Sequence, residues 1–374
     1  MMLTNHAAVR WLDFYGNNNG ISGCLSFIGS FAPVMFFFAT GLGYGASHRI
    51  GYHGDYRNVL FKATILIIMD GFMCQRFTII AGWDFLAFIA FSMIVLLLIK
   101  DQYNAVPKAL FAAIFFALFK FIGTLIYRTL GLKQTWLAIA IGLGGIESIS
   151  YWFAPWFTYP FVGFIIGAMI VKWSDLIQQK KALFISSAAA TGTLIGLVSF
   201  YLYNKGAIYF RWGTMSINYF IASFSVIAFI LVIAYLFPIF TQLRKIIQAI
   251  SMRGISSLAV VPVHYFILGM IDIVAPGTLK PKLFYGILPF WLFMCMYAAK
   301  IINRYTTILS TRLVPASGLY LLLILIIIAV VLSLEINAVT KEVLTLMAQL
   351  TLCLLLASPL NSFIRHNEKL SDKS

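Results

Sequence analysis

Two histidines are the residues whose type and position best suit proton-transfer chemistry. His264 lies about ten residues into an apolar run that begins at Gly254, and Pro262 precedes it by two residues. An ionisable side chain inside such a run is costly, which makes it a functional candidate. The alternative is a neutral imidazole hydrogen-bonded between helices, for which Pro262 would free a backbone carbonyl. Either way we expect the ring to face the protein interior, because its N–H would lack a partner in hydrocarbon.

His6 is the second candidate, and Arg10 and Asp13 follow it near the start of the chain. Imidazole titrates near neutral pH, can take a proton from a hydroxyl or an amine, and can be oriented by a carboxylate such as that of Asp13. The pattern therefore allows a base–carboxylate pair. The alternative is an exposed terminal histidine with no part in chemistry.

Several other polar residues are candidates for substrate binding. Asp70 lies inside an apolar run, and Asp84 lies at the outer end of the next run. The structural alternative for Asp70 is an ion pair with Lys62 or with Lys120. Glu147 lies in a glycine-rich stretch, where its carboxylate can contact a polar acceptor.

Arg211 and Trp212 are adjacent, and a guanidinium beside an aromatic plate suits the face of a sugar. The alternative for this pair is an ordinary anchor at the membrane interface. The sequence contains no phosphate loop and no GxSxG, HExxH or CxxC motif, and its four scattered cysteines have no metal-site spacing. We therefore expect no metal.

These residues lie in a chain that is too apolar for a soluble fold. Of its 374 residues, 61% are hydrophobic and 10% charged, against about 45–50% and a quarter in ordinary globular domains. A spanning helix needs roughly 20 apolar residues, and continuous rather than alternating runs favour helices over a barrel. We predict an all-α polytopic transmembrane helix bundle of about eleven helices, at 24–46, 58–75, 83–99, 107–127, 157–171, 183–203, 217–239, 255–274, 283–299, 315–334 and 343–361.

The basic residues indicate the orientation. The net charge is +15, but Lys and Arg lie mainly in short loops between apolar runs, so we expect no nucleic-acid partner. The excess of Lys and Arg on the cytoplasmic side is largest if 128–156 is an outer segment that does not cross the membrane and if the C-terminus is cytoplasmic. We therefore expect a multi-pass protein of the cell membrane. The N-terminus is then outside and 1–6 resembles the end of a helix, so we expect an upstream first helix that this chain lacks.

Three stretches resemble the membrane acyltransferase superfamily that includes acyltransferase family 3 and heparan-α-glucosaminide N-acetyltransferase-like proteins. Phe31–Gly43 is similar to its "FF-x-x-S/T-G" helix, and Tyr159–Ala168 to its "P-x-x-G-x-x-x-x-G" span. Gly254-x-Ser256-x7-His264 is similar to its late "G-x-S" helix with a histidine. Their order fits over most of the chain. The family's basic residue, about eleven positions before its first histidine, has no counterpart here because the position would precede Met1.

The resemblance implies a single transmembrane acyltransferase-like domain over 1–374. It implies transfer of an acyl group, acetyl above all, from cytosolic acetyl-CoA to a sugar hydroxyl or amine on the outer face. His6 would be the general base or a transient acyl carrier, with Asp13 and His264 supporting it. The candidate substrate-binding residues are Asp70, Asp84, Glu147, Arg211, Trp212 and Ser256. Cytoplasmic Lys and Arg offer contacts for the coenzyme A phosphates.

Two other functions remain open. One is a transporter or flippase for a polar or glycan substrate, with Asp70 and His264 as coupling groups. The other is a glycan polymerase or ligase. A transporter would neither hydrolyse acetyl-CoA nor become labelled by it, which distinguishes it from the transferase.

Overall fold

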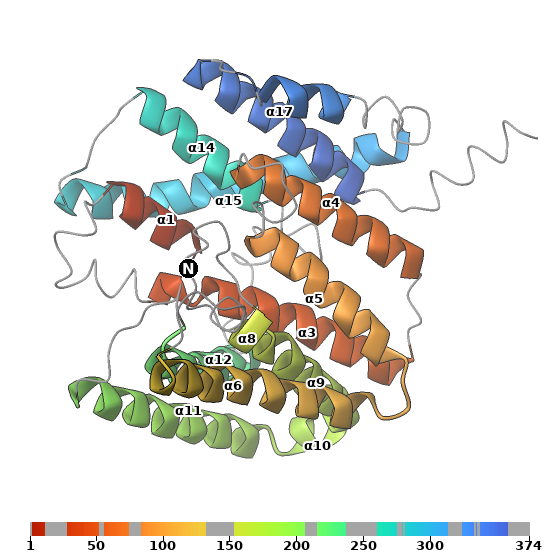
Figure 1. Cartoon of the computed structure of the whole chain (residues 1–374), viewed down its shortest axis with the longest axis vertical. Helices are drawn as coiled ribbons and strands as arrows, with labels where there is room; N and C mark the ends of the chain where they lie inside the picture. The colour runs from red at the N-terminus through yellow and green to blue at the C-terminus, as the bar shows by residue number, and fades with distance from the viewer. Residues whose placement is uncertain are drawn as a thin grey trace, which may run out of the picture. The chain divides into compact units, whose positions relative to one another are not determined.

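The computed structural model describes residues 2–11, 28–51, 56–74, 84–131, 153–205, 215–236, 260–274, 279, 281–312, 324–332, 334 and 337–357. All regular secondary structure in these ranges is helical (Figure 1), which confirms the predicted all-α class. Strands are absent from the described residues because the apolar runs are continuous and helices alone satisfy their backbone groups locally.

The helices follow the predicted apolar runs closely. Each of the eleven predicted spans coincides with a helix, one of them represented by residues 324–332. The principal helices are α1 (Met2–Trp11), α3 (Ala32–Ile50), α4 (Tyr56–Cys74), α5 (Phe85–Lys100), α6 (Ala105–Thr129), α9 (Thr158–Lys172), α11 (Lys181–Asn204), α12 (Ile217–Leu236), α14 (Val260–Val274), α15 (Pro281–Arg312) and α17 (Ala338–Ala357), with the short α8 (Phe153–Trp156) and α10 (Ser174–Gln179) beside α9.

Five of these helices are long and apolar enough to cross a membrane: Ile28–Ile50, Ala105–Thr129, Lys181–Asn204, Ile217–Leu236 and Leu283–Ile302. They indicate a multi-pass membrane protein. The total of eleven crossings and the cytoplasmic C-terminus stay predictions. The proposed outer segment 128–156 falls largely on residues outside the described ranges.

One expectation about the start of the chain was wrong. Residues 1–6 were expected to be the end of a helix, but α1 runs from Met2 to Trp11 and His6 lies in its middle. The cause is amphipathic packing, since Leu3, Ala7, Ala8 and Trp11 are buried on one face and hold the helix beyond His6.

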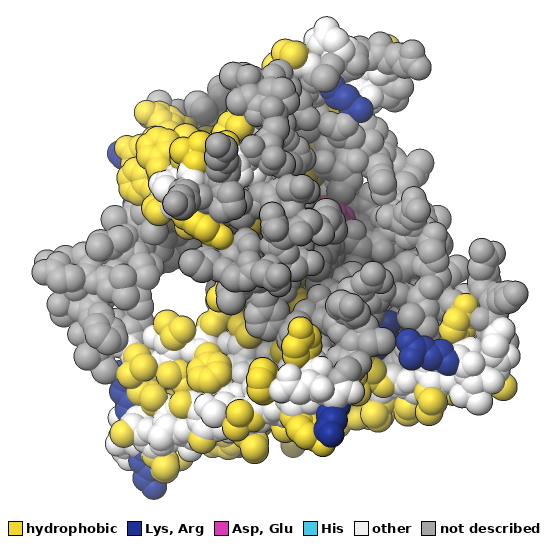
Figure 2. Space-filling view, turned by 90° about the vertical axis from the view of Figure 1, so that its left-hand side faces the viewer, with side chains coloured by type: hydrophobic (Ala, Val, Ile, Leu, Met, Phe, Trp, Pro, Cys, Tyr) yellow, Lys and Arg dark blue, Asp and Glu magenta, His cyan; other side chains and the backbone are white. Residues whose placement is uncertain are grey.

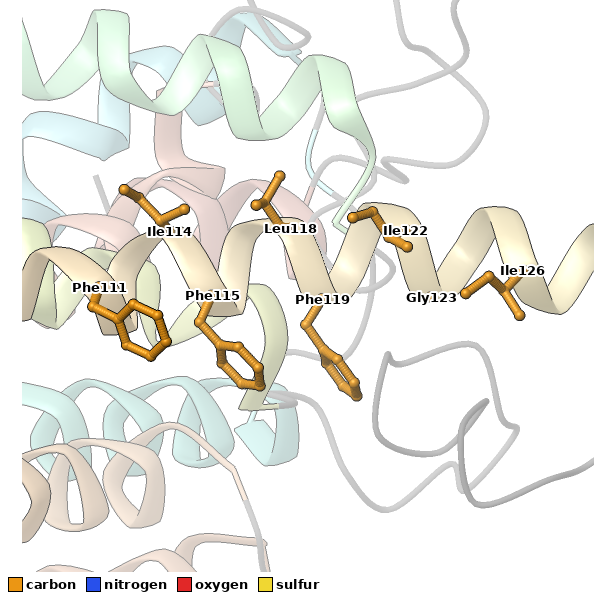
Figure 3. Close-up of a pocket in the computed structure, with 8 residues that line it drawn as sticks. All are labelled: Phe111, Ile114, Phe115, Leu118, Phe119, Ile122, Gly123 and Ile126. Carbon is orange, nitrogen blue, oxygen red and sulfur yellow. The ribbon is translucent and has the colours of Figure 1, made fainter.

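The apolar surface of the chain supports a lipid environment. On α6, Phe111, Phe115 and Phe119 form one row along the helix, and Ile114, Leu118 and Ile122 form another (Figure 3). All but Phe119 of these six are strongly exposed, as are Leu194 and Phe200 on α11. In Figure 2, hydrophobic side chains cover far more of the described surface than Lys and Arg do. On helices of this length and hydropathy, such a surface fits a lipid environment.

Contacts between Cα atoms divide the chain into two compact units. Unit 1 comprises Met1–Gly29, Asp55–Ala90 and Ile247–Ser374, and unit 2 comprises Ser30–Gly54 and Phe91–Ile246. Each unit is described by itself below. The expectation of a single domain over 1–374 stays a prediction.

Unit 2 is built on a close glycine contact between α3 and α9. A Cβ atom added at Gly41 would lie 1.8 Å from the carbonyl oxygen of Pro160, and one at Gly45 would lie 1.9 Å from that of Phe164. The contact is reciprocal, since Gly163 and Gly167 of α9 meet α3 backbone in the same way. Each helix therefore presents a G-x-x-x-G face, the pattern that lets backbones approach within a membrane. These helices contain the first two stretches on which the family resemblance rests.

Polar side chains join α11 to α12 in the same unit. Ser225 donates to the carbonyl oxygen of Gly192 over 2.7 Å, and Ser199 donates to the side-chain oxygen of Asn218 over 2.5 Å. Interhelical bonds of this kind replace the hydrophobic drive that is missing between helices in lipid.

Unit 1 holds α1 in a hydrophobic cluster with α14 and α15. The ring of Trp11 packs edge-on against that of Trp291, with centroids 5.0 Å apart, and edge-on against that of Phe284, with centroids 6.5 Å apart. The indole N–H of Trp291 donates to the carbonyl oxygen of Leu3 over 3.3 Å. These contacts fix both ends of α1 and so fix the position of His6.

Candidate functional site

α1 presents His6 at the edge of its buried face. Leu3, Ala7 and Trp11 follow one another at intervals of four residues along the buried stripe, and His6 lies about a third of a turn to one side. The imidazole is accordingly half-buried. A side chain in this position can contact the interior and still be reached from outside it.

α14 presents His264 on its fully buried face. His264 is one turn after Val260 and one turn before Leu268, and both of these neighbours are buried. The ring faces the interior, as expected, with hydrogen-bond partners for both of its nitrogens. The carbonyl that holds it belongs to Val260, two residues before Pro262.

A continuous chain of hydrogen bonds joins the two histidines. The Nδ1 of His264 lies 2.8 Å from the carbonyl oxygen of Val260, and its Nε2 lies 2.7 Å from the Nδ1 of His6. The ring planes differ by 16° and the centroids are 5.0 Å apart. The distance between the centroids equals the length of the hydrogen bond plus the centroid-to-nitrogen distances in the two rings. The hydrogen bond therefore lies nearly in the plane of both rings.

The backbone carbonyl sets the direction of every bond in this chain. A carbonyl oxygen only accepts, so His264 must carry its proton on Nδ1. A fully buried imidazole is most stable when neutral, which leaves its Nε2 as an acceptor. His6 must then donate from Nδ1, and the Nε2 of a neutral His6 is the acceptor at the end of the chain.

Tyr265 completes the cluster at that nitrogen. Its hydroxyl oxygen lies 3.3 Å from the Nε2 of His6. The tyrosine ring is tilted against both imidazoles, with centroids 4.9 Å from His6 and 4.4 Å from His264. The sequence interpretation did not include Tyr265, although its position directly after His264 was a usable signal.

Asp70 and Asp84 belong to a different network. The carboxylate of Asp70, on α4, accepts hydrogen bonds from the backbone N–H groups of Asp84 (2.7 Å), Leu86 (3.2 Å) and Ala87 (3.2 Å). It therefore caps the N-terminus of α5, where N–H groups lack partners within their own helix and negative charge is favoured. Asp84 takes part through its main chain.

The predicted ion pair of Asp70 with Lys62 is not among the described contacts of this carboxylate. Its oxygens are directed to α5 instead, because three backbone donors satisfy a buried carboxylate better than one flexible lysine. Five other predicted site residues, Asp13, Glu147, Arg211, Trp212 and Ser256, lie outside the described residues.

Several cations at or near helix ends gather at one end of unit 2. The glycine contacts make α3 and α9 parallel, so their C-terminal ends lie together. His48, near the end of α3, hydrogen-bonds through Nδ1 to the carbonyl oxygen of Lys100 over 2.5 Å, which adds the end of α5. We call this region the basic end of unit 2, and it comprises Arg49, Lys100, Lys108, Lys172, Lys180 and Lys181.

The positive-inside bias predicts that segments carrying these cations share the cytoplasmic side. The structure brings them to one end of the unit without showing which side that end faces. His48 itself lies in the last turn of α3, half-buried against Phe164, with ring centroids 5.6 Å apart.

No family model, curated protein or solved structure matches this chain. The acyltransferase resemblance therefore rests on the three sequence stretches. Of their residues, Gly41 and Gly163 have a packing role between α3 and α9, and His264 belongs to the histidine cluster.

Proposed function

We propose that this chain is a membrane-embedded acyltransferase that moves an acyl group from acyl-CoA to a hydroxyl or amine of a saccharide. The observation that carries the proposal is the hydrogen-bonded pair of His6 and His264. A base needs an unprotonated nitrogen at a reachable position and a partner that fixes its orientation. His6 supplies the nitrogen at its Nε2. His264 orients the His6 ring, because its Nε2 accepts the hydrogen bond from the Nδ1–H of His6.

The reaction balances with these two residues. The acceptor oxygen or nitrogen attacks the acyl carbonyl carbon while its proton passes to the Nε2 of His6. The carbon–sulfur bond of the thioester breaks, and the same proton then returns from Nε2 to the leaving thiolate of coenzyme A. His264 holds the Nδ1–H of His6 throughout. Because His264 is fully buried, the transient positive charge stays on His6.

The basic end of unit 2 supports a phosphorylated donor. Coenzyme A carries several negative charges on its phosphates, and Lys and Arg side chains are the usual protein partners of such groups. Lys172, Lys180 and Lys181 follow one another closely at this end. Acetyl-CoA would supply the activated acyl group.

The transporter alternative has less support among the described residues. It used Asp70 and His264 as coupling groups, but the carboxylate of Asp70 already accepts three backbone hydrogen bonds that hold α5. Taking up and releasing a proton there would disturb the start of that helix.

The test is acetyl transfer by the purified chain in nanodiscs. Radiolabelled acetyl-CoA and a mixture of saccharide acceptors are supplied, and both free thiol and labelled saccharide are measured. We expect both products, and we expect His264→Ala to lower their rate roughly 5–150-fold, since His6 then loses the buried acceptor of its Nδ1–H. Uptake of saccharide into liposomes without any thiol release would refute the transferase.

A further inference from the structure

The inference concerns the hydroxyl of Tyr265 and deepens the proposed function, on which it rests. The Nε2 of His6 is the acceptor end of the histidine chain, so the Tyr265 hydroxyl donates to it. At 3.3 Å this bond is long, since hydroxyl donors usually lie about 2.5–3.0 Å from their acceptor. The nitrogen that acts as the base is thus already in contact with an O–H group.

We propose that the Tyr265 hydroxyl holds the place of the acceptor substrate. An acceptor with an O–H or N–H group makes the same hydrogen bond to Nε2 and displaces the tyrosine hydroxyl when it binds. Tyr265 is therefore a positioning residue that keeps water from the base until an acceptor arrives. The exchange costs little, because one hydrogen bond to Nε2 replaces another.

The placement of Tyr265 allows this exchange. Tyr265 and His6 are both half-buried, whereas His264 is fully buried, so the Nε2 end of the chain is the reachable end. Rotation about the side-chain bonds of Tyr265 moves the hydroxyl and leaves α14 in place. The bonds that orient His6 run through His264 and Val260 and do not involve the tyrosine.

Removing the hydroxyl should have two consequences. In Tyr265→Phe the acceptor no longer competes with the tyrosine, so its KM should fall roughly fivefold, the effect of one neutral hydrogen bond. Water gains the same access, so hydrolysis of acyl-CoA without an acceptor should rise by a similar factor. In that reaction the water oxygen bonds to the acyl carbon, the carbon–sulfur bond breaks, and the proton reaches the thiolate through Nε2.

The hydrogen bond itself is tested without any substrate. Histidine labelled with 15N is incorporated into the full chain in nanodiscs, and His6→Gln and His264→Gln assign the signals. We expect an unprotonated Nε2 on His6 and a protonated Nδ1 on His264. Tyr265→Phe should shift the His6 Nε2 signal, and Tyr285→Phe, which removes a hydroxyl elsewhere in unit 1, should not. A protonated His6 Nε2, or a signal that Tyr265→Phe leaves unchanged, overturns the inference.

The kinetic measurements separate this inference from the function. If the unmodified chain turns over acyl-CoA but Tyr265→Phe changes neither KM nor hydrolysis, the placeholder role is wrong and the transferase stands. If the unmodified chain neither transfers the acyl group to an acceptor nor hydrolyses acyl-CoA, the proposed function is wrong. The proposed role of Tyr265 is then wrong as well. Size-exclusion profiles identify a variant that fails to fold, in which case Tyr265→Leu takes its place.

Discussion

At the scale of single residues, a backbone carbonyl sets the direction of the hydrogen bonds in the histidine cluster. Val260 fixes the proton of His264, and His264 fixes that of His6. The two rings are 258 residues apart in the sequence, and only packing of α1 against α14 and α15 brings them together.

His6→Ala should nearly abolish transfer. A positioned general base contributes typically 10²–10⁴-fold, so we expect a rate loss of that order. The buried Nε2 of His264 also loses its hydrogen-bond donor, so the melting temperature should fall modestly. The measurement is the initial rate of acetyl transfer beside a thermal melt, with rates compared at a temperature where both proteins are folded. A variant that keeps most of its activity would show that His6 is not the base.

The sequence indicated both histidines but not their relation. His264 was recognised because an ionisable group inside an apolar run is costly, and His6 because Arg10 and Asp13 follow it near the start of the chain. Their contact could not be predicted, because it depends on the exact rotation of α1, which Leu3, Trp11 and Trp291 set through side-chain packing. The same limit applied to Asp70, whose role as a cap of α5 depends on the angle between two helices.

At the scale of elements, two helix contacts depend on single residues. One is the cap of α5 by Asp70, and the other is the glycine contact of α3 with α9. The G-x-x-x-G pattern of Gly41 and Gly45 was present in the sequence together with that of Gly163 and Gly167. It was interpreted only as a family motif, although spacing alone also indicates close helix packing.

Asp70→Ala should destabilise the start of α5. Three backbone N–H groups lose their acceptor in a buried position, which costs on the order of 3 kcal/mol in total. Hydrogen exchange at the amides of Leu86 and Ala87 should accelerate, and thermal unfolding in detergent should begin earlier. Asp175→Asn, at an exposed carboxylate on α10, is the matched control. Unchanged exchange at Leu86 and Ala87 would contradict the capping role.

Gly45→Ala should separate α3 from α9. The added methyl group would lie 1.9 Å from a backbone oxygen, which cannot move without its whole helix. Overpacking of this kind costs typically 1–3 kcal/mol or more. Gly43→Ala is the control on the same helix, because no heavy atom lies within 4 Å of its added Cβ. It should be neutral or slightly stabilising. Equal melting temperatures for the two variants would refute the close contact.

At the scale of the whole molecule, composition predicted the class of the protein and most of its helices. The apolar runs are long and continuous, so hydrocarbon leaves the backbone no alternative to helix formation. The grouping of these helices into two units could not be predicted in this way. It depends on which helices fit one another, and α3 pairs with α9 across a long stretch of intervening sequence.

Sidedness should follow the charges in the loops. We expect Lys108→Cys and Lys181→Cys to react with a membrane-impermeant reagent from the same side, since both lie at the basic end of unit 2. Lys205→Cys, beyond the other end of α11, should react only from the opposite side. Positive-inside bias predicts that the first two face the cytoplasm. Labelling of Lys181→Cys and Lys205→Cys from one side would mean that α11 does not cross.

The glycine contact also bears on the synthesis of the chain. About 120 residues separate Gly45 of α3 from Gly163, the first glycine of the facing pair on α9. At 5–20 residues per second, the ribosome needs roughly 6–24 s to reach α9 after α3 has been made. During this interval the exposed glycine face of α3 has no helix to meet, and lipid or the insertion machinery must cover it. The order in which the helices are made therefore differs from the order in which they pack, because α3 can pack against α9 only after α9 has been synthesised.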